Sequence, residues 1–386
     1  MKVLDQYFSI LFSKKKNKYK VFILIFIQMI LSILFVTSLY KIDIIPEKYI
    51  ISIIIFLVVV LAVNFFIRLN NKGKSFAMSF FSITIIILLS FSIFYVYKIN
   101  YAMKEMSSDD VIINSDIEKP FNIYISGIDV YGDIETSSRS DVNIIATVNP
   151  KTHQILLTTT PRDFYVPIPG ISNGQKDKLT HAGNYGVYAS MNTLEELYKT
   201  TIDFYIRINF TSLIEIVDEL GGVDVFSEYD FTTSEESGYV MNIKKGINHL
   251  NGKQALAFSR ERKNLDDGDN QRGKNQEALI IAMINKISSP KIIVKAANII
   301  DSISENIDTN FSQKQIQSLI KMQLNNSIQW DIQSIAAEGT EGQDYCYSTG
   351  DTLLYVTYPN STSIAEIRQK INNMLNIQVS ENTLAY

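Results

Sequence analysis

The stretches FNIYISGI (residues 121–128) and VNIIATVNPKTHQILLTTT (residues 142–160) decide the fold of the C-terminal part of the chain. The first stretch alternates along its length, which is typical of a β-strand with one buried face. Within the second stretch, the turn sequence NPKT (149–152) separates two apolar runs and predicts a β-hairpin. A sheet is therefore expected to begin at about residue 121.

Further strands and helices follow this hairpin. The segment FTSLIEIVDEL (210–220) is amphipathic and ends at Gly221, a residue type that commonly terminates helices. The mixed order of elements predicts an α/β fold, an α/β/α sandwich whose central mixed sheet is covered on both faces. Strands are predicted at 202–209, 223–226, 328–335 and 353–358, and helices at about 184–199, 210–220, 251–259, 272–287, 291–304, 312–324 and 362–375.

Three uncharged apolar segments precede the sheet, at residues 21–40, 49–67 and 75–97. Each is close to the length of about 20 residues that a helix needs to cross the hydrocarbon core of a bilayer. The first segment is also compatible with a cleaved signal peptide, but its apolar run is long and two more spans follow. We therefore expect a basic tail at 1–20 and a three-helix transmembrane anchor at 21–98.

Basic residues around these spans predict their orientation. Five lysines lie at 14–20 and three basic residues at 68–74, whereas the loop at 41–48 carries two residues of each sign. Because Lys and Arg are retained on the cytoplasmic side, the N-terminus is expected in the cytoplasm and everything after Lys98 outside. Residues 99–118 are polar and predict a short stalk.

The remaining residues, 119–386, form the predicted outer domain, which is acidic. Residues 1–98 hold 12 of the 36 Lys and Arg and 3 of the 40 Asp and Glu, which leaves 24 basic and 37 acidic residues for 99–386. Such a domain is a poor binder of nucleic acid, which requires clustered basic residues. The single cysteine, Cys346, excludes an internal disulfide and a cysteine metal site. The histidines show no metal-ligand spacing and are expected to be structural or on the surface: His153, His181 and His249.

Arginines are rare after residue 98 and are gathered in short motifs. Five of the seven fall in SSRSD, TTPRDFYVPIPG and SRERKNLDDGDNQRGKNQ. The planar guanidinium grips phosphate oxygens in pairs, so this grouping indicates a bound polyanion, although ion pairs with the abundant acids would also explain it. The five are Arg139, Arg162, Arg260, Arg262 and Arg272.

Two aspartates lie beside these motifs at predicted strand ends. Asp129 ends the first strand and Asp141 begins the second, so adjacent strand ends would bring both to one edge of the sheet. Two hard oxygen ligands beside phosphate-binding arginines suit Mg²⁺, which fills its octahedron with water and phosphate oxygens. The alternative role for each aspartate is that of a turn or capping residue.

These motifs resemble those of the LytR–CpsA–Psr family. The resemblance covers residues 121 to about 290 continuously, through GID, RSD, NPKT, PRDFYVPIPG, KLTHAGNYG, IDFYIRINF, IVDELGGVDV and LNGKQALAFSRERKNLDDGDNQRGKNQ, and the tail more weakly. The three spans are similar to the capsule-polysaccharide branch, and the stalk is too short for that branch's accessory domain.

The resemblance implies a phosphotransferase of Gram-positive-type cell-envelope assembly in the cell membrane. Such an enzyme moves a glycosyl phosphate from a polyprenyl-pyrophosphate carrier to a peptidoglycan hydroxyl, attaching capsule or teichoic acid. It uses Mg²⁺, with Mn²⁺ as an alternative, and binds the lipid in an apolar tunnel. In a sequence, the residues of such a tunnel look like ordinary core residues.

The resemblance also assigns residue roles by motif position. Asp129 and Asp141 correspond to magnesium-associated carboxylates, and Asp163 is expected to orient Arg162 or the acceptor. The expected catalytic residues are Asp141, Arg139, Arg162 and Asp163. The expected pyrophosphate-binding residues are Arg139, Arg162, Arg260, Arg262, Arg272 and Gln276.

Two other functions use the same residues. A pyrophosphatase would take water as the acceptor in the same site. A non-catalytic lipid-binding regulator, such as a transcriptional attenuator, would bind without reacting. The cytoplasmic tail of about twenty residues is too short to bind DNA as a folded domain, and its lysines are expected to contact anionic lipid.

The charge asymmetry around the spans predicts the topology of the chain. A reporter enzyme that is active only outside the cytoplasm should be active when fused after Tyr386, because basic residues hold the N-terminus inside. A cytoplasmic reporter at the same position should be silent. Activity of the cytoplasmic reporter alone would overturn the orientation.

Overall fold

The computed structural model describes residues 17–70, 75–107, 116–131, 134, 137–265, 268–289, 307–326 and 328–376. Two compact units are present, the first formed by residues 1–101 with 317–326 and the second by residues 102–316 with 327–386. The predicted helix at 291–304 lies outside the described residues.

The first unit contains three long apolar helices, which confirms the three predicted spans. They are α2 (Asn17–Ile42), α3 (Glu47–Asn70) and α4 (Ser75–Met106). Their segments Ile23–Ile42, Glu47–Ile67 and Ser79–Met106 are long and apolar enough to cross a membrane. Helix α4 continues to Met106, so the first residues of the expected stalk are helical.

A buried polar network joins the three helices of the anchor. The side-chain amide of Asn64 on α3 donates to Gln28 Oε1 on α2 at 3.0 Å and to Ser82 Oγ on α4 at 2.7 Å. All three side chains are buried between the helices. Hydrogen bonds between helices fix which faces meet, because the hydrophobic effect does not distinguish apolar faces within lipid.

The second unit is built on the mixed sheet that the sequence predicts. Its six strands are arranged in the order β11-β6-β1-β2-β3-β12. Strand β1 pairs in parallel with β6 and antiparallel with β2, and β3 pairs antiparallel with β2 and in parallel with β12. The strands are β1 (Phe121–Ile128), β2 (Ser140–Asn149), β3 (Gln154–Thr159), β6 (Phe204–Ile208), β11 (Ile307–Thr309) and β12 (Asp331–Ala336).

This topology gathers the loops after β1, β3 and β6 and the start of β2 at one edge of the sheet. Strands β1, β3 and β6 run in the same direction, so their carboxyl ends meet at that edge. Asp129, Arg162 and Asn209 each follow one of these ends. Asp141 lies at the start of β2, whose residue Ser140 pairs with Ile128. The carboxyl edge of an open α/β sheet is the usual position of a ligand site.

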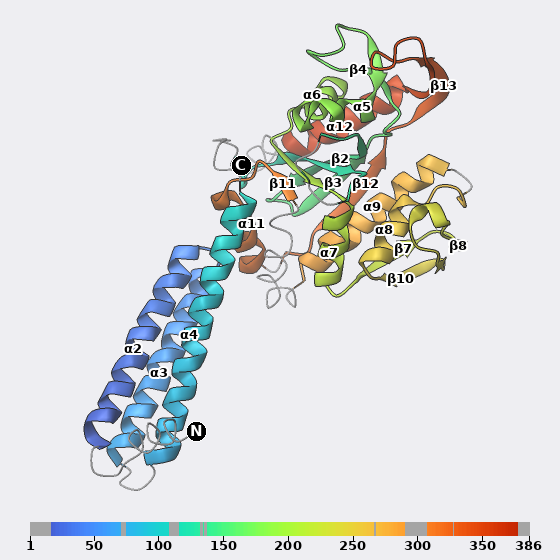
Figure 1. Cartoon of the computed structure of the whole chain (residues 1–386). Helices are drawn as coiled ribbons and strands as arrows, with labels where there is room; N and C mark the ends of the chain where they lie inside the picture. The colour runs from blue at the N-terminus through green and yellow to red at the C-terminus, as the bar shows by residue number, and fades with distance from the viewer. Residues whose placement is uncertain are drawn as a thin grey trace, which may run out of the picture. The chain divides into compact units, whose positions relative to one another are not determined.

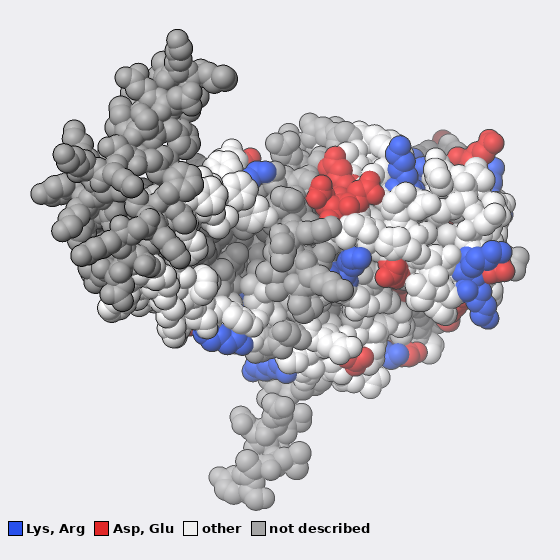
Figure 2. All heavy atoms as spheres, turned by 90° about the horizontal axis from the view of Figure 1, so that it is seen from below, with Lys and Arg blue, Asp and Glu red and all other residues white. Residues whose placement is uncertain are grey.

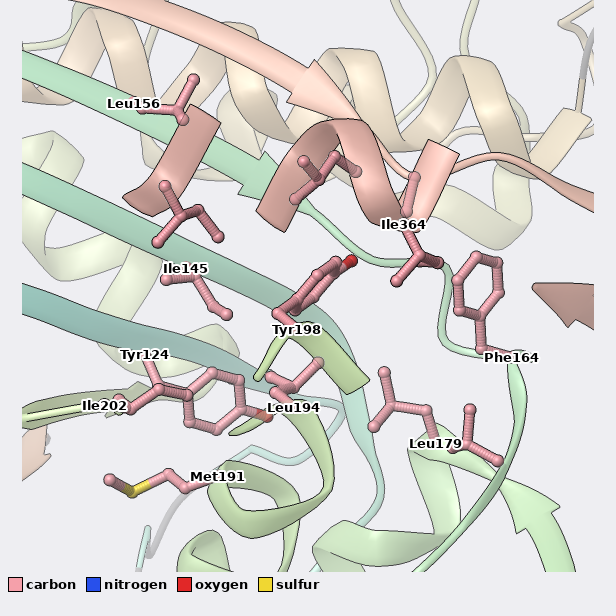
Figure 3. Close-up of a cluster of buried hydrophobic side chains, with 14 of the residues drawn as sticks. Tyr124, Ile145, Leu156, Phe164, Leu179, Met191, Leu194, Tyr198, Ile202 and Ile364 are labelled. Atoms are coloured by element: carbon pink, nitrogen blue, oxygen red, sulfur yellow. The ribbon is translucent and has the colours of Figure 1, made fainter. Parts of the chain in front are cut away.

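One face of the sheet packs against α5 (Leu179–Ala182), α6 (Val187–Tyr198) and α12 (Ser361–Asn376) (Figure 1). Figure 3 shows this core, in which Tyr124 and Ile145 of the sheet lie among side chains of the helices. Full burial of each large apolar side chain contributes roughly 1.5–3 kcal/mol. The hydroxyls of the two fully buried tyrosines are hydrogen-bonded, Tyr124 to Asn143 at 2.6 Å and Tyr198 to Thr160 at 2.8 Å.

The other face carries a second layer (Figure 1). Asparagine side chains cap α7 and α8: Asn209 accepts from the Ser212 N–H at 2.9 Å and Asn251 from the Gln254 N–H at 3.0 Å. Helix α8 approaches α7 so closely that a Cβ at Gly252 would lie 2.3 Å from the Ile214 carbonyl oxygen. The layer consists of α7 (Phe210–Glu219), β7 (Val223–Ser227), β10 (Gly246–Leu250), α8 (Gly252–Arg260) and α9 (Gly268–Ile287).

Several smaller elements differ from the sequence prediction. The helix expected at 184–199 begins only at Val187, because Gly186 adopts φ +101°, which a helix does not accommodate. Strand β13 was not expected, since its sequence GTEGQDY has no apolar alternation. The remaining elements are β4 (Tyr165–Pro167), β5 (Lys176–Lys178), β8 (Phe231–Thr232), β9 (Asn242–Ile243), α11 (Gln313–Asn326), β13 (Gly339–Tyr345) and β14 (Leu353–Pro359), with 3₁₀ turns at Gly183–Tyr185 and Glu235–Ser237.

The polar network of the anchor generates a prediction about Asn64. Asn64→Leu removes two interhelical hydrogen bonds and should lower the free energy of unfolding of the anchor by roughly 1–2 kcal/mol. Titration of the full chain in mild detergent micelles with a denaturing detergent measures this change in the free energy of unfolding. Ser52→Ala, an exposed hydroxyl bonded only to its own helix at Lys48, is the control and should have no effect. Equal stability of the two variants would contradict a stabilising role for Asn64.

Candidate active site

A deep cavity lies between the sheet and the α7–α8–α9 layer. Its volume is about 580 Å³. Ile125 and Ile206 point into it because they alternate along their strands with Tyr124 and Tyr205, which pack into the opposite core. Most of the wall is apolar: Ile125, Val142, Ile206, Ile208, Leu213, Ile216, Leu256, Leu279, Ile280, Met283, Ile284 and Ile287.

One end of the cavity is charged. Its side chains come from the carboxyl edge of the sheet, from the 3₁₀ turn Glu235–Ser237, from the end of α8 and the segment after it, and from the first turns of α9. Among the described lining residues, five are cationic and three are carboxylates, so positive charge prevails in a domain that is acidic as a whole. The charged end consists of Asp129, Asp141, Arg162, Glu236, Arg260, Arg262, Lys263 and Arg272.

Arg162 is held between two carboxylates. Its Nη1 lies 3.1 Å from Asp141 Oδ1 and its Nε lies 3.6 Å from Asp163 Oδ2. Asp141 also accepts from the Thr180 hydroxyl at 3.3 Å, and Lys178 Nζ lies 2.8 Å from Asp163. These opposite charges fix the direction of the guanidinium, so its remaining donors are positioned before any ligand binds.

Arg260 is held by an aromatic ring and a carboxylate. Its guanidinium carbon lies 4.4 Å from the centroid of Phe210, the first residue of α7. Its Nη2 is 4.0 Å from Asp129 Oδ1. A cation over the face of an aromatic ring is attracted by the negative face of the ring, which leaves the guanidinium edge available to anions.

Glu261 shapes the segment that carries the arginines. This buried carboxylate accepts hydrogen bonds from the backbone N–H groups of Ser234, of Arg262 at 3.0 Å and of Asn264 at 3.1 Å. Burial alone would raise the pKa of Glu261, but these donors together hold the pKa below its ordinary value. Glu261 therefore fixes the path of the chain between Arg260 and Arg262.

Helix α9 closes the charged end from a third side. Arg272 and Gln276 both line the cavity, four residues apart on one face of the helix. The Gln276 side chain donates to the Ser259 carbonyl at 3.3 Å, and Asn275 donates to the Phe258 carbonyl at 3.3 Å. These bonds join the start of α9 to the end of α8.

The structure brings most of the predicted site residues together. Seven line the cavity: Asp129, Asp141, Arg162, Arg260, Arg262, Arg272 and Gln276. Asp163 does not line it but lies behind Arg162, where the sequence analysis expected an orienting group. Arg139 precedes β2, is exposed, and is not among the lining residues.

Sequence reasoning did not identify several residues of the site. Phe210 contacts Arg260, Glu261 fixes the backbone between Arg260 and Arg262, and Lys178 pairs with Asp163. None of the three stands in a sequence motif that indicates this role. An acid between two arginines in SRER was the available signal for Glu261. The partners of Glu261 are spread from residue 234 to residue 264, so only the folded chain reveals its role.

A metal ion would find two candidate ligands here. Within the described residues, no group of three or more His, Cys, Asp or Glu side chains is arranged to hold a metal. Asp129 and Asp141 are the carboxylates at the sheet edge, each beside an arginine. Two carboxylate ligands suit a hard cation such as Mg²⁺, whose other coordination positions are filled by water and phosphate oxygens.

Comparison with known proteins places these features in a family. A model described as the LytR_cpsA_psr family matches residues 91–373. The polyisoprenyl-teichoic acid–peptidoglycan teichoic acid transferase TagV of Bacillus subtilis is 30% identical over 261 residues, covering 67% of this chain and 65% of TagV. TagU of Enterococcus faecalis, which carries the same transferase name, is 32% identical over 268 residues, covering 68% of this chain and 82% of TagU.

The crystal structure of B. subtilis TagV has a similar fold. Its TM-score is 0.56 at 29% sequence identity, over 67% of this chain and 98% of the TagV chain in the crystal. The chain thus spans less than two thirds of the full TagV sequence but nearly all of the part seen in the crystal.

The contacts of Glu261 predict a pH-dependent stability. Because its folded pKa is lowered, the carboxylate stabilises the fold fully above the unfolded pKa, near 4.5, and this contribution is lost as the pH falls through the folded pKa. Glu261→Gln should cost roughly 1–3 kcal/mol at neutral pH, since an amide leaves a backbone N–H without an acceptor. The melting temperature of each protein between pH 3 and 7 measures this. Parallel curves for the two proteins would contradict the prediction.

Proposed function

Because the chain belongs to the LytR–CpsA–Psr family, we propose that it transfers a glycosyl phosphate from a polyprenyl-pyrophosphate carrier to a hydroxyl of peptidoglycan. The observation that carries this proposal is the joining of an apolar cavity to an arginine-rich end. The substrate has the same two parts, a hydrocarbon chain and a pyrophosphate. The names of TagV and TagU, which mention teichoic acid and peptidoglycan, support this substrate class.

The apolar wall is the proposed site for part of the lipid chain. Burial of hydrocarbon in such a cavity is favourable by about 25 cal/mol for each Å² removed from water. The three apolar helices would keep the domain at the membrane that contains this lipid. From the basic residues around the spans, we place the N-terminus in the cytoplasm and the catalytic domain outside.

The arginines are the proposed pyrophosphate ligands. Arg162, Arg260, Arg262 and Arg272 supply positive charge where the transferred phosphate becomes more negative. The acceptor hydroxyl forms the new P–O bond as it loses its proton. The bond from the same phosphorus to the bridging oxygen breaks, and polyprenyl phosphate leaves. No protein nucleophile is required, because phosphoryl transfer depends mainly on position and charge.

Asp129 and Asp141 are the proposed ligands of Mg²⁺, or of Mn²⁺. When bound, the ion would add positive charge beside the pyrophosphate. Their positions fit this role, since both carboxylates line the charged end and each faces an arginine through Oδ1 only in the described ion pairs. Asp163 would keep Arg162 oriented through their ion pair, and Lys178 would in turn hold Asp163 in place.

The transfer reaction itself is the decisive test. The full chain in lipid nanodiscs would receive a synthetic polyprenyl-pyrophosphoryl saccharide, peptidoglycan oligomers and Mg²⁺, with the products identified by mass. A phosphodiester-linked product that disappears when a chelator removes the metal supports the proposal. If the only product is free saccharide phosphate, formed with water as the acceptor, the protein is a pyrophosphatase. If no reaction occurs, the protein is a non-catalytic lipid-binding protein.

Arg262 provides a sharper prediction. Its side chain is exposed within the charged end, and its alternative partners Asp266 and Asp267 lie outside the described residues. Arg262→Lys keeps the charge but loses the bidentate fork. Loss of one charge-assisted hydrogen bond in the transition state, about 1.5–3 kcal/mol, should slow transfer about ten- to more than a hundredfold at an unchanged melting temperature.

A matched control lies on the far side of the sheet. Arg368 on α12 donates to the carbonyls of Tyr198 at 3.1 Å and Leu197 at 3.3 Å. Arg368→Lys should lower the melting temperature and leave the transfer rate unchanged. Transfer by Arg262→Lys at the native rate would remove Arg262 from the phosphate site.

A further inference from the structure

The hairpin of β13 and β14 presents an exposed aromatic face. Tyr345 pairs directly with Leu353, and Gln343 pairs with Tyr355, so the four side chains lie on one side of the hairpin. The exposed fractions are 56% for Tyr345, 49% for Leu353 and 42% for Tyr355. These four residues are called the tyrosine face.

The tyrosine face is held rigidly from below. On the opposite side of the hairpin, the ring of Tyr358 lies so close to Gly342 that a Cβ there would be 2.4 Å from the ring. The Tyr358 hydroxyl bonds Asp344 at 3.0 Å, and the Tyr165 hydroxyl donates to the Tyr345 carbonyl at 2.8 Å. A surface fixed in this way loses little conformational entropy when it binds a ligand.

The hairpin is joined directly to the charged end of the cavity. The N–H of Thr357 on β14 donates to the Asp163 carbonyl at 2.8 Å. The ammonium group of Lys178 lies 2.8 Å from Asp163 Oδ1 and 5.8 Å from the centroid of the Tyr355 ring. Asp163 in turn lies beside Arg162, so a short run of contacts leads from the tyrosine face to the phosphate site.

We propose that the tyrosine face binds the glycan strand of the acceptor, an inference that rests on the proposed transfer to peptidoglycan. The C–H groups on one face of a pyranose ring are apolar and weakly positive, so they stack on the negative face of an aromatic ring. Tyrosines supply this area with little loss of rotamer freedom. Gln343 lies opposite Tyr355 and two residues from Tyr345, with an amide suited to sugar hydroxyls.

The geometry of phosphoryl transfer favours the acceptor over the donor as the occupant. The attacking and leaving oxygens lie roughly in line on opposite sides of the phosphorus. The leaving polyprenyl phosphate belongs to the cavity, whereas Asp163 and Lys178, which connect to the tyrosine face, are not among its lining residues. The glycan on the tyrosine face thus approaches the phosphate site from outside the lipid cavity.

The test compares a double variant with a matched control. The full chain in nanodiscs would carry Tyr345→Ala and Tyr355→Ala. The control would carry Tyr229→Ala and Tyr239→Ala, which are equally exposed tyrosines outside the hairpin. The probe is a tetrasaccharide released from peptidoglycan, titrated by calorimetry. Loss of two stacked rings should weaken its binding about tenfold or more, with the control unchanged.

A second variant separates stacking from damage to the fold. Tyr345→Phe with Tyr355→Phe keeps both rings and should bind the tetrasaccharide within about threefold of the native affinity. Affinity for the polyprenyl-pyrophosphoryl saccharide should be the same in all variants. Native affinity for the tetrasaccharide in the double alanine variant, or no binding by the native chain, would overturn the inference.

The outcomes also distinguish this inference from the proposed function. Binding of the tetrasaccharide that is lost in the alanine variant, without transfer by the native chain, would support the tyrosine face and contradict the transferase. Transfer by the alanine variant with an unchanged KM for peptidoglycan oligomers would support the transferase and contradict the role of the tyrosine face. A loss confined to the donor saccharide would assign the tyrosine face to the donor and overturn the inference.

Discussion

The ion pair between Arg162 and Asp141 is the interaction on which the arrangement of the site depends. It joins the end of β3 to the start of β2 at 3.1 Å, and both side chains are about four-fifths buried, with exposed fractions of 22% and 20%. A pair so withdrawn from water is costly to break, because each charge would be left without its partner. The pair therefore keeps a cation aimed at the cavity, in a domain whose overall charge is negative.

Charge is distributed in small groups elsewhere. On the face in Figure 2, the described charged side chains lie in small groups on a largely uncharged surface, and several groups contain both basic and acidic residues. The positive excess of the charged end is therefore a local property, produced by chain segments that meet at the carboxyl edge of the sheet. Under the proposed function, this local placement would let the site bind a single pyrophosphate without a general affinity for polyanions.

The sequence predicted features that are encoded locally and missed those that depend on distant segments. The strands at 121–160 alternate within a few residues, and Asp129 and Asp141 follow from pairing neighbouring strands. Strand β13 is a polar segment that becomes a strand only through pairing with β14. The role of Glu261 depends on its contact with Ser234, which is distant in sequence, so no short motif around Glu261 reveals that role.

The network of Gln28, Asn64 and Ser82 affects which parts of the anchor can be exchanged between proteins. Each helix contributes one member, so each helix alone would carry a polar side chain into hydrocarbon. The two hydrogen bonds of Asn64 therefore favour an anchor that keeps all three spans together. A fusion protein that kept α3 without both neighbours would lose at least one of these bonds and leave part of the Asn64 amide unpaired in hydrocarbon.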